Sequence, residues 1–196
     1  MRRFSAYAWI FLALFLVCKG NVFAQDSSDD FGKALESLKI YVPEDEKARL
    51  YLGIDQSDGQ IAVNQINAEV LIIEIFSMYC PHCQRHAPIS NNLFNTISGN
   101  DDIKDKVKII GIGIGNSAYE VDLFREKYNI LFPLFDDRGS AVINVLKGVA
   151  TPHYFGVRLK VGGPLDVFYS KSAGYSDADE FLKLMLDLSG FKSGGD

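Results

Sequence analysis

A buried strand that leads directly into a pair of cysteines constrains the fold of this chain most. Residues 70–76 form a nearly continuous run of branched apolar side chains, with one acid, Glu74, inside it. Such a run is typical of a strand that is covered on both faces. Cys80 and Cys83 follow, separated by Pro and His, where the pattern predicts the start of a helix. A Cys-x-x-Cys pair at the start of a helix after a buried strand is the geometry of a redox pair.

The rest of the chain alternates strands and helices around this segment. The first helix is expected to run to about Ile97, and Ser117 with Glu120 three residues later predicts a capped start for the second. The expected strands are 107–114, 132–135, 153–161 and 165–170, and the later helices are 117–128, 139–146 and 177–188. The last two strands form a hairpin across a Gly-Gly-Pro turn. This order predicts an α/β fold in which helices cover both faces of a mixed sheet.

The segment before this core has weaker patterns. Residues 25–45 are expected to hold a polar linker and then a short amphipathic helix, since apolar residues recur at helical spacing over 31–38 and Pro43 ends the pattern. Residues 48–54 and 60–66 are strand-like, with a Ser-Asp-Gly turn between them.

The amino terminus predicts export. Two arginines precede an apolar run over residues 4–18, and Ala24 ends a Val-Phe-Ala triplet that fits a cleavage site. These features are typical of a secretory signal peptide, which we expect over residues 1–24. One alternative is an uncleaved membrane anchor, although a membrane-spanning helix needs about 20 apolar residues. Another is lipidation of Cys18. At the other end, residues 191–196 are expected to be a flexible tail.

Composition excludes several classes of protein. With 47% hydrophobic residues, 23% charged residues and three cysteines, the chain is not a disordered tail, a collagen-like repeat or a disulfide-dense mini-protein. A formal net charge of −5 argues against nucleic-acid binding, which needs a concentrated basic face.

Gly111, Gly113 and Gly115 alternate and lack the G-x-G-x-x-G spacing of a nucleotide-binding loop. We interpret them as glycines that allow close helix packing.

The two cysteines after the buried strand carry the chemistry. Cys80 is expected at a helix N-terminus, where unpaired N–H groups and the helix dipole favour the thiolate. Cys83 lies one turn further on, in position to attack a mixed disulfide at Cys80 and release the partner. A structural disulfide is one alternative, and a metal site formed with His86 is another. A cleaved signal peptide would remove Cys18 and leave only this pair in an oxidising compartment.

Residues 72–83 resemble the active-site segment of the thioredoxin superfamily and, within it, of the DsbA-like disulfide oxidases. The shared features are an acid six residues before the first cysteine, an aromatic-Ser-x-aromatic approach, and Pro-His between the cysteines. Pro88 matches the proline that kinks the family's active-site helix. Thr151-Pro152 is similar to the family's cis-proline segment, which faces the cysteines. The resemblance covers about residues 70–188 and implies a thioredoxin-like fold of three layers.

Departures from the DsbA-like pattern bear on the subfamily. Too few residues separate Cys83 from Pro152 for the helical domain that DsbA-like enzymes insert there, so no large helical insertion is expected. The shorter core, the strands expected upstream of Val70 and the Thr before the proline are more similar to TlpA-like thioredoxins, which are secreted or membrane-tethered thiol reductases. Tyr79 replaces the usual Trp. Residues 46–190 therefore resemble a TlpA-like core with a DsbA-like active site.

Two side chains close to the cysteines are expected to be catalytic with them. Glu74 lies in an apolar strand, so burial should raise its pKa and allow it to relay a proton to or from Cys83. His82 is expected to interact with the Cys80 thiolate and, when protonated, to stabilise it.

Three further residues are expected to contact the substrate. Pro81 lies between the cysteines, and a cis peptide bond at Pro152 would turn the backbone of Thr151 toward them, so that an extended substrate segment pairs with that backbone as an added strand. Arg85 and His86 are expected to be exposed.

The leading hypothesis is an exported thiol–disulfide oxidoreductase, periplasmic or otherwise outside the cytoplasm, with Cys80 attacking and Cys83 resolving. Its partners would be cysteine-containing proteins and a membrane redox partner that resets the pair. The direction of electron flow stays open. No metal, flavin or nucleotide cofactor and no nucleic acid is implied, and membrane contact would run only through an uncleaved N-terminal segment.

Two other functions remain open. A peroxiredoxin-like peroxidase is one, since Ser77 and Cys80 fit part of that family's Ser/Thr-x-x-Cys element, although Ile73 stands where its proline is expected. A metal chaperone that uses both cysteines and a histidine is the other.

Overall fold

The structure is a computed structural model that describes residues 25–146, 148–160 and 163–192. The signal peptide expected over residues 1–24 lies outside these ranges, as does most of the tail expected over 191–196.

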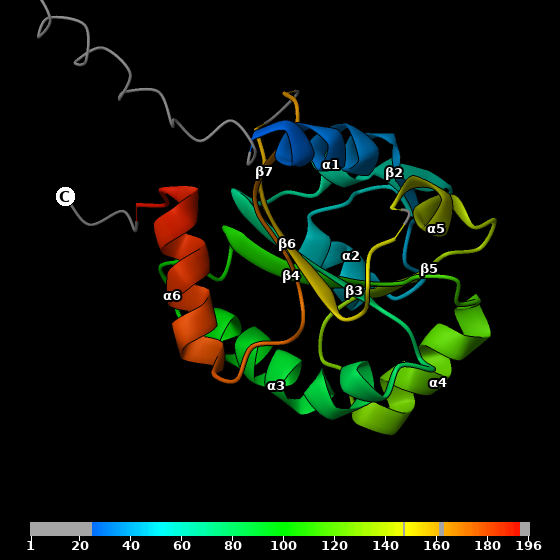
Figure 1. Cartoon of the computed structure of the whole chain (residues 1–196). Helices are drawn as coiled ribbons and strands as arrows, with labels where there is room; N and C mark the ends of the chain where they lie inside the picture. Colours follow the sequence, from blue (N-terminus) through cyan, green and yellow to red (C-terminus); the bar gives the residue numbers. More distant parts are fainter. Residues whose placement is uncertain (1–24, 147, 161–162, 193–196) are drawn as a thin grey trace, which may run out of the picture.

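The centre of the molecule is a five-stranded sheet (Figure 1). Its strands are β3 (Val70–Phe76), β4 (Val107–Gly113), β5 (Leu134–Asp136), β6 (His153–Arg158) and β7 (Asp166–Ser172). They lie in the order β5-β4-β3-β6-β7. β3, β4 and β5 are parallel to one another, whereas β6 is antiparallel to both β3 and β7. The sheet is therefore mixed, with the expected hairpin at one edge.

Helices cover both faces of this sheet. One face carries α1 (Gln25–Ser37) and α5 (Ala141–Val145), and the other carries α3 (Pro81–Ser98), α4 (Ala118–Tyr128) and α6 (Ala178–Ser189). The short helix α2 (Glu46–Leu52) lies beside β4, where the Tyr51 hydroxyl bonds the backbone of Ile109. Successive side chains of a strand point to opposite faces, so β3 contributes to both cores. Ile73 packs in one core with Leu35 of α1, and Ile72 packs in the other with Leu93 of α3 and Met185 of α6. The sheet thus separates two helical layers, and the residues described between α3 and β6 hold no large helical insertion.

Residues 48–54 were expected to be a strand, and this expectation is wrong because most of them form helix α2. The side chain of Asp45 accepts hydrogen bonds from the N–H groups of Lys47 and Ala48 and so caps the helix start. Gly53, with φ 66°, ends the helix in the left-handed conformation. These two caps outweigh the strand-like pattern of the residues between them.

The upstream elements also differ in their bounds from the expected ones. α1 begins at Gln25, where a linker was expected. A short antiparallel pair is formed by β1 (Lys39–Tyr41) and β2 (Gln60–Ala62), and the rest of the expected strand at 60–66 contains the 3-10 turn Val63–Gln65.

Two glycines of β4 allow neighbouring side chains to pack closely, as expected, but these side chains come from a strand as well as from a helix. A Cβ atom at Gly113 would lie 2.9 Å from a methyl group of Val121 on α4. A Cβ atom at Gly111 would collide with the side chain of Leu134 on β5. Side chains of both neighbours therefore occupy the space that these glycines leave.

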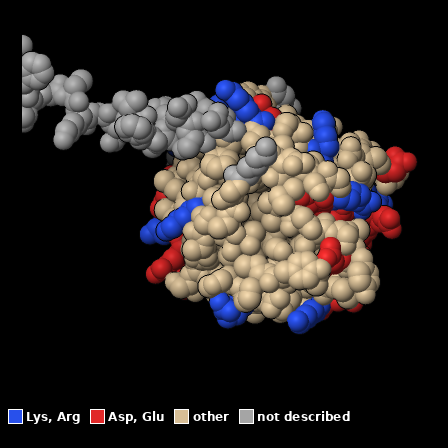
Figure 2. Space-filling model, turned by 45° about the vertical axis from the view of Figure 1, so that its right-hand side comes forward, with Lys and Arg blue, Asp and Glu red and all other residues tan. Residues whose placement is uncertain are grey.

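No helix within the described ranges is long and apolar enough to span a membrane. Figure 2 shows the molecule with the side of α4 and α5 turned forward, and on this face Lys and Arg are scattered around the rim and do not gather in one patch. The middle of the face is formed mostly by uncharged residues.

Candidate active site

A short turn connects the carboxyl end of β3 to the cysteine pair. Asn116 from the loop after β4 accepts a hydrogen bond from the N–H of Met78 at 2.8 Å. Gln84 of α3 donates to the carbonyl oxygen of Met78 at 2.7 Å. Cys80 is the N-cap of α3 and Pro81 is its first residue, where a missing N–H costs nothing because that group has no helical partner. The turn is thus held from both sides.

Cys80 is half-buried and is the more reactive thiol of the pair. Its Sγ donates to the carbonyl oxygen of Thr151 at 3.3 Å. Burial by itself raises the pKa of Cys80, but hydrogen bonds from the side chain of Thr151, from Cys83 and from the backbone of His82 outweigh it. The pKa of Cys80 therefore lies below that of an ordinary thiol, as a nucleophile at a helix N-terminus requires.

Cys83 lies one turn further into α3, where it is fully buried. Burial is the main cause that raises its pKa to about 12, and the neighbouring Cys80 adds to it. A hydrogen bond from the backbone of Ser77 acts in the opposite direction. The two thiols therefore differ in both access and acidity, with Cys80 outward and Cys83 shielded behind it.

This difference predicts selective alkylation. At pH 7 iodoacetamide should modify Cys80 at least about a hundredfold faster than Cys83, because only the thiolate reacts and Cys83 is both neutral and buried. Mass spectrometry of peptides after timed quenching measures both rates, and unfolding in denaturant should equalise them. Equal labelling of the two residues in the folded protein would contradict the assignment.

The Thr151–Pro152 segment lies against the cysteine pair, as expected, and its peptide bond is cis. A cavity of about 480 Å³ opens beside it and is lined by His82 and Arg85 of α3 together with Thr151, Pro152 and residues 172–174. The structure therefore brings His82, Thr151 and Pro152 together at one hollow next to Cys80.

Glu74 is buried in β3, with a side chain only 3% exposed. It lies opposite Tyr154 in the antiparallel pairing of β3 with β6, so the two side chains share a face of the sheet. Burial raises the pKa of Glu74 to about 7, and hydrogen bonds from Ser90 and Tyr154 partly offset the rise. The expected upward shift of the pKa is confirmed, and the carboxyl group is poised to change its charge near neutral pH.

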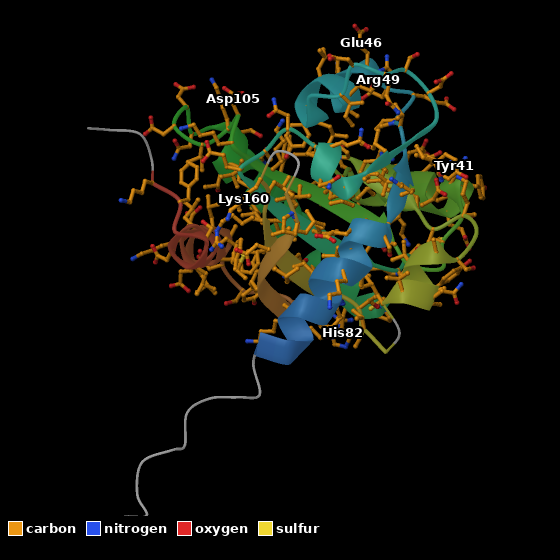
Figure 3. The ribbon with its side chains drawn as sticks, turned by 90° about the horizontal axis from the view of Figure 1, so that it is seen from above. Tyr41, Glu46, Arg49, His82, Asp105 and Lys160 are labelled. Atoms are coloured by element: carbon orange, nitrogen blue, oxygen red, sulfur yellow. The ribbon has the colours of Figure 1, made fainter. Side chains whose placement is uncertain are left out.

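His82 is exposed at the start of α3. In the view of Figure 3 it lies at the edge of the molecule opposite Glu46 and Arg49 of α2. Its Nδ1 lies 3.0 Å from the guanidinium of Arg85. Since a guanidinium only donates, Nδ1 accepts and the proton of the neutral ring is on Nε2. Arg85, which is exposed as expected, therefore places a positive charge beside His82.

His86 was expected to be exposed, and this expectation is wrong: its side chain is 8% exposed. His86 lies on the same face of α3 as His82, one turn further along, where Gly174 and Tyr175 cover it and its ring contacts Tyr154 and Tyr175. Within the described ranges, no three His, Cys, Asp or Glu side chains are close enough together to hold a metal ion.

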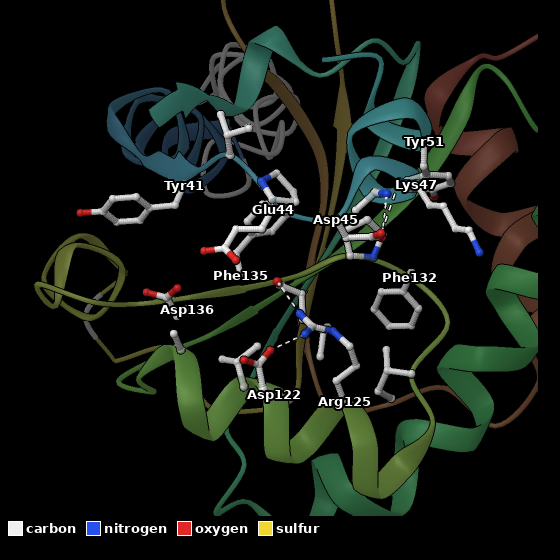
Figure 4. A pocket seen from close by; sticks show the side chains of 18 of the residues that line it. Tyr41, Glu44, Asp45, Lys47, Tyr51, Asp122, Arg125, Phe132, Phe135 and Asp136 are labelled. Atoms are coloured by element: carbon white, nitrogen blue, oxygen red, sulfur yellow. Dashed lines mark hydrogen bonds and ion pairs between the residues drawn. The ribbon is translucent and has the colours of Figure 1, made fainter. Parts of the chain in front are cut away.

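A second cavity, of about 870 Å³, lies between α4, β5 and residues 41–59 (Figure 4). Arg125 of α4 extends into it, where it pairs with Asp122 and donates to the carbonyl oxygen of Leu134 at 3.2 Å. The described residues that line it include none of those predicted for the site. This cavity is therefore separate from the cysteine pair.

The sequence did not indicate three residues that shape the site. Asn116 holds the turn before Cys80, and Ser90 and Tyr154 lower the pKa of the buried Glu74 carboxyl. Ser90 follows Cys83 by seven residues, so helical spacing places it on the same face of α3. Asn116 and Tyr154 reach the site through strand pairing, for which the sequence carries no local signal.

Comparison with known proteins agrees with this geometry. No family model matches the sequence. The thiol-disulfide oxidoreductase ResA of Halalkalibacterium halodurans is 25% identical over 142 residues, which cover 72% of this chain and 70% of that protein. The structure is similar to MTB dsbF, with a TM-score of 0.54 and 16% identity over 79% of this chain and 97% of that one. The fold is thioredoxin-like.

A second solved structure extends the likeness. It is described as a secreted Mycobacterium tuberculosis disulfide oxidoreductase homologous to E. coli DsbE, and it matches with a TM-score of 0.51 and 15% identity over 79% of this chain and 98% of that one. The Cys80–Cys83 pair and the sequence relative together indicate a thiol–disulfide oxidoreductase, and the chain is similar to ResA in sequence and to the DsbE homologue in fold.

Proposed function

We propose that this thioredoxin-like oxidoreductase exchanges disulfides with the cysteines of other proteins outside the cytoplasm. The observation that carries the proposal is the pairing of an accessible, acidified Cys80 with a buried Cys83 one helical turn behind it. In the reductive direction the Cys80 thiolate attacks a partner disulfide, forms a mixed disulfide and releases one partner thiolate. Cys83 then attacks Cys80, which releases the second partner thiolate and leaves the Cys80–Cys83 disulfide. The oxidative direction is the reverse.

The neighbouring residues take roles in these two steps. Glu74 accepts the proton that Cys83 loses as it attacks, and returns it in the reverse direction. Its place in β3 on the face that packs against α3 supports this role. His82, with its Nε2–H free of Arg85, donates to the sulfur that develops negative charge at Cys80.

Substrate binding is assigned to the hollow beside the pair. An extended partner segment pairs with the backbone at Thr151, while Pro81 and Pro152 form apolar walls on either side of the attacking sulfur. The cavity of about 480 Å³ that Thr151 and Pro152 line supports this placement for these two residues, and for Pro81 the support is its position next to Cys80 at the start of α3.

The same proposal includes export. Residues 1–24 act as a signal peptide or, if retained, as a membrane tether. A membrane redox partner then resets the cysteine pair after each turnover. The secreted M. tuberculosis protein with a similar fold supports this location.

The reduction potential of the Cys80–Cys83 pair tests the activity and its direction. Equilibration with glutathione buffers, read by mass shift after alkylation, should give a two-electron couple that disappears in Cys80→Ser. A value near about −120 mV indicates an oxidase and one near about −270 mV a reductase. The wild type should also exchange with a disulfide-bonded test protein without consuming peroxide. Peroxide consumption without protein disulfide exchange would refute the proposal.

A further inference from the structure

One stripe of α3 forms a wall of the hollow beside Cys80. The residues of this stripe stand at helical positions i, i+3, i+4 and i+7, which share a face of the helix: His82, Arg85, His86 and Ile89. Residues 150–152 and 172–174 form the opposite wall. The N–H of Ala173 donates to the carbonyl oxygen of Pro152 at 3.0 Å and so joins the two segments of that wall. The hollow therefore has a defined wall on each side, next to the reactive sulfur.

Arg85 supplies the charge of this hollow. Among the described residues that line it, Arg85 is the only one with a permanent charge, and none is an Asp or a Glu. The whole chain, in contrast, carries a formal net charge of −5. The hollow is thus a positive spot on an acidic protein. An acidic ligand would be attracted to it by Arg85 and not by the charge of the protein as a whole.

The guanidinium of Arg85 forms no ion pair with the described part of the chain. The other arginines in that part are bonded to aspartates or to backbone carbonyl groups of the chain itself: Arg49, Arg125, Arg138 and Arg158. Arg85 instead donates from Nη2 to Nδ1 of His82 at 3.0 Å. A guanidinium has five N–H donors, so this bond leaves most of them available to a ligand. The group that matches them in charge and shape is a carboxylate, which can accept two parallel hydrogen bonds.

The spacing along α3 indicates where such a carboxylate would stand in a bound partner segment. Arg85 follows Cys80, the N-cap of the helix, by five residues, which is a rise of about 7.5 Å. Two residues of an extended segment span about 6.6 Å, and their side chains point to the same side. A segment whose cysteine meets Cys80 therefore brings the residue two positions away from that cysteine close to Arg85.

We infer that Arg85 is a specificity-determining residue, which selects partner segments that carry Asp or Glu two positions from the reacting cysteine. The inference rests on the proposed function, in which an extended segment pairs with the backbone at Thr151. The carboxylate accepts from the donors that His82 leaves free, so the bond between Arg85 and His82 is retained. Arg85 thus acts on which partners bind and not on the exchange of the sulfur atoms.

The test compares peptides that differ at one position. Asp, Asn or Lys stands two residues before the cysteine in one set and two residues after it in another. Each peptide is offered to the reduced full chain as a mixed disulfide with thionitrobenzoate, the leaving group of lower pKa. Attack by Cys80 forms a disulfide with the peptide and releases the coloured thionitrobenzoate thiolate, so absorbance follows the rate.

The wild type should react about fivefold faster with the Asp peptide than with the Asn peptide in one of the two sets. This ratio should fall toward one in about 1 M salt, which screens exposed charges. Arg85→Gln should bring the ratio close to one, and Arg85→Glu should make the Lys peptide the fastest. Arg85→Lys keeps the charge but loses the planar fork, so it should retain only part of the preference. Lys183→Gln, the matched control, removes an exposed charge of α6 outside the hollow and should leave the ratio unchanged.

The other outcomes separate this inference from the proposed function. An Asp-to-Asn ratio near one in the wild type, or an equal ratio in the wild type and Arg85→Gln, would overturn the inference and leave the exchange activity intact. If Arg85→Gln slowed all peptides by the same factor, Arg85 would be acting through His82 or the thiol, which also overturns the inference. A wild type that releases no more colour than Cys80→Ser would overturn the proposed function and the inference with it.

Discussion

Replacing Cys83 by serine is expected to trap partner proteins in long-lived mixed disulfides at Cys80. The accessible Cys80 still attacks, but the residue behind it no longer has a sulfur to complete the exchange. Non-reducing gels of protein recovered from cells should show high-mass bands that collapse on addition of a reductant. Because the resolving step is abolished and not merely slowed, nearly all of the reacted protein should be found in these bands.

The matched control is Cys80→Ser, which should trap essentially nothing. Cys83 is buried and its pKa is raised to about 12, so it cannot replace Cys80 as the attacking thiolate. Trapping of equal amounts by the two variants would show that the roles of the two thiols are not divided as we propose.

Replacing Glu74 by glutamine is expected to change how stability depends on pH. The folded protein raises the pKa of Glu74 to about 7, above the value of about 4.3 in an unfolded chain. The folded state therefore binds the proton more tightly, and this contribution to stability is full below about pH 4 and is lost as pH rises through 7. Glutamine mimics the neutral acid and has no such loss. As the pH rises from 5 to 9, the free energy of unfolding of Glu74→Gln should therefore increase by about 3 kcal/mol relative to that of the wild type.

Urea unfolding of both proteins at a series of pH values measures this difference. Glu46→Gln provides the matched control, since Glu46 is exposed on α2. Parallel stability curves for the wild type and Glu74→Gln across this range would mean that Glu74 stays ionised in the folded protein. The same variant should slow disulfide exchange even where it is more stable, which separates the functional role of the acid from its cost in stability.

Local pattern was sufficient for the elements that carry the chemistry. The apolar run of β3 and the Cys-Pro-His-Cys start of α3 lie next to each other in the chain, so their geometry follows from strand and helix periodicity alone. The pattern failed at residues 48–54, where the caps Asp45 and Gly53 decide for a helix. Capping chemistry was present in the sequence there, but the aromatic and branched residues outweighed it in the prediction.

The exposure of the two histidines of α3 could not be predicted from the sequence. His82 and His86 lie one helical turn apart, and both were assigned to the surface side of the helix or to the cysteines. Their exposure differs because Tyr154 of β6 and the segment before α6 cover His86, whereas His82, at the start of the helix, is exposed. Helical spacing states that two residues share a face, but not how much of that face its neighbours will cover.

The sequence by itself determined the fold class, the reactive pair and the presence of an acid in the strand beneath it, because each depends on residues close together in the chain. Only the tertiary structure decided what these groups touch. Thr151 reaches Cys80, and Tyr154 reaches both Glu74 and His86, through the antiparallel pairing of β3 with β6, across some seventy residues of chain. The register of that pairing is fixed by the burial of whole strands between two helical layers, a property of the assembled core that no single segment contains.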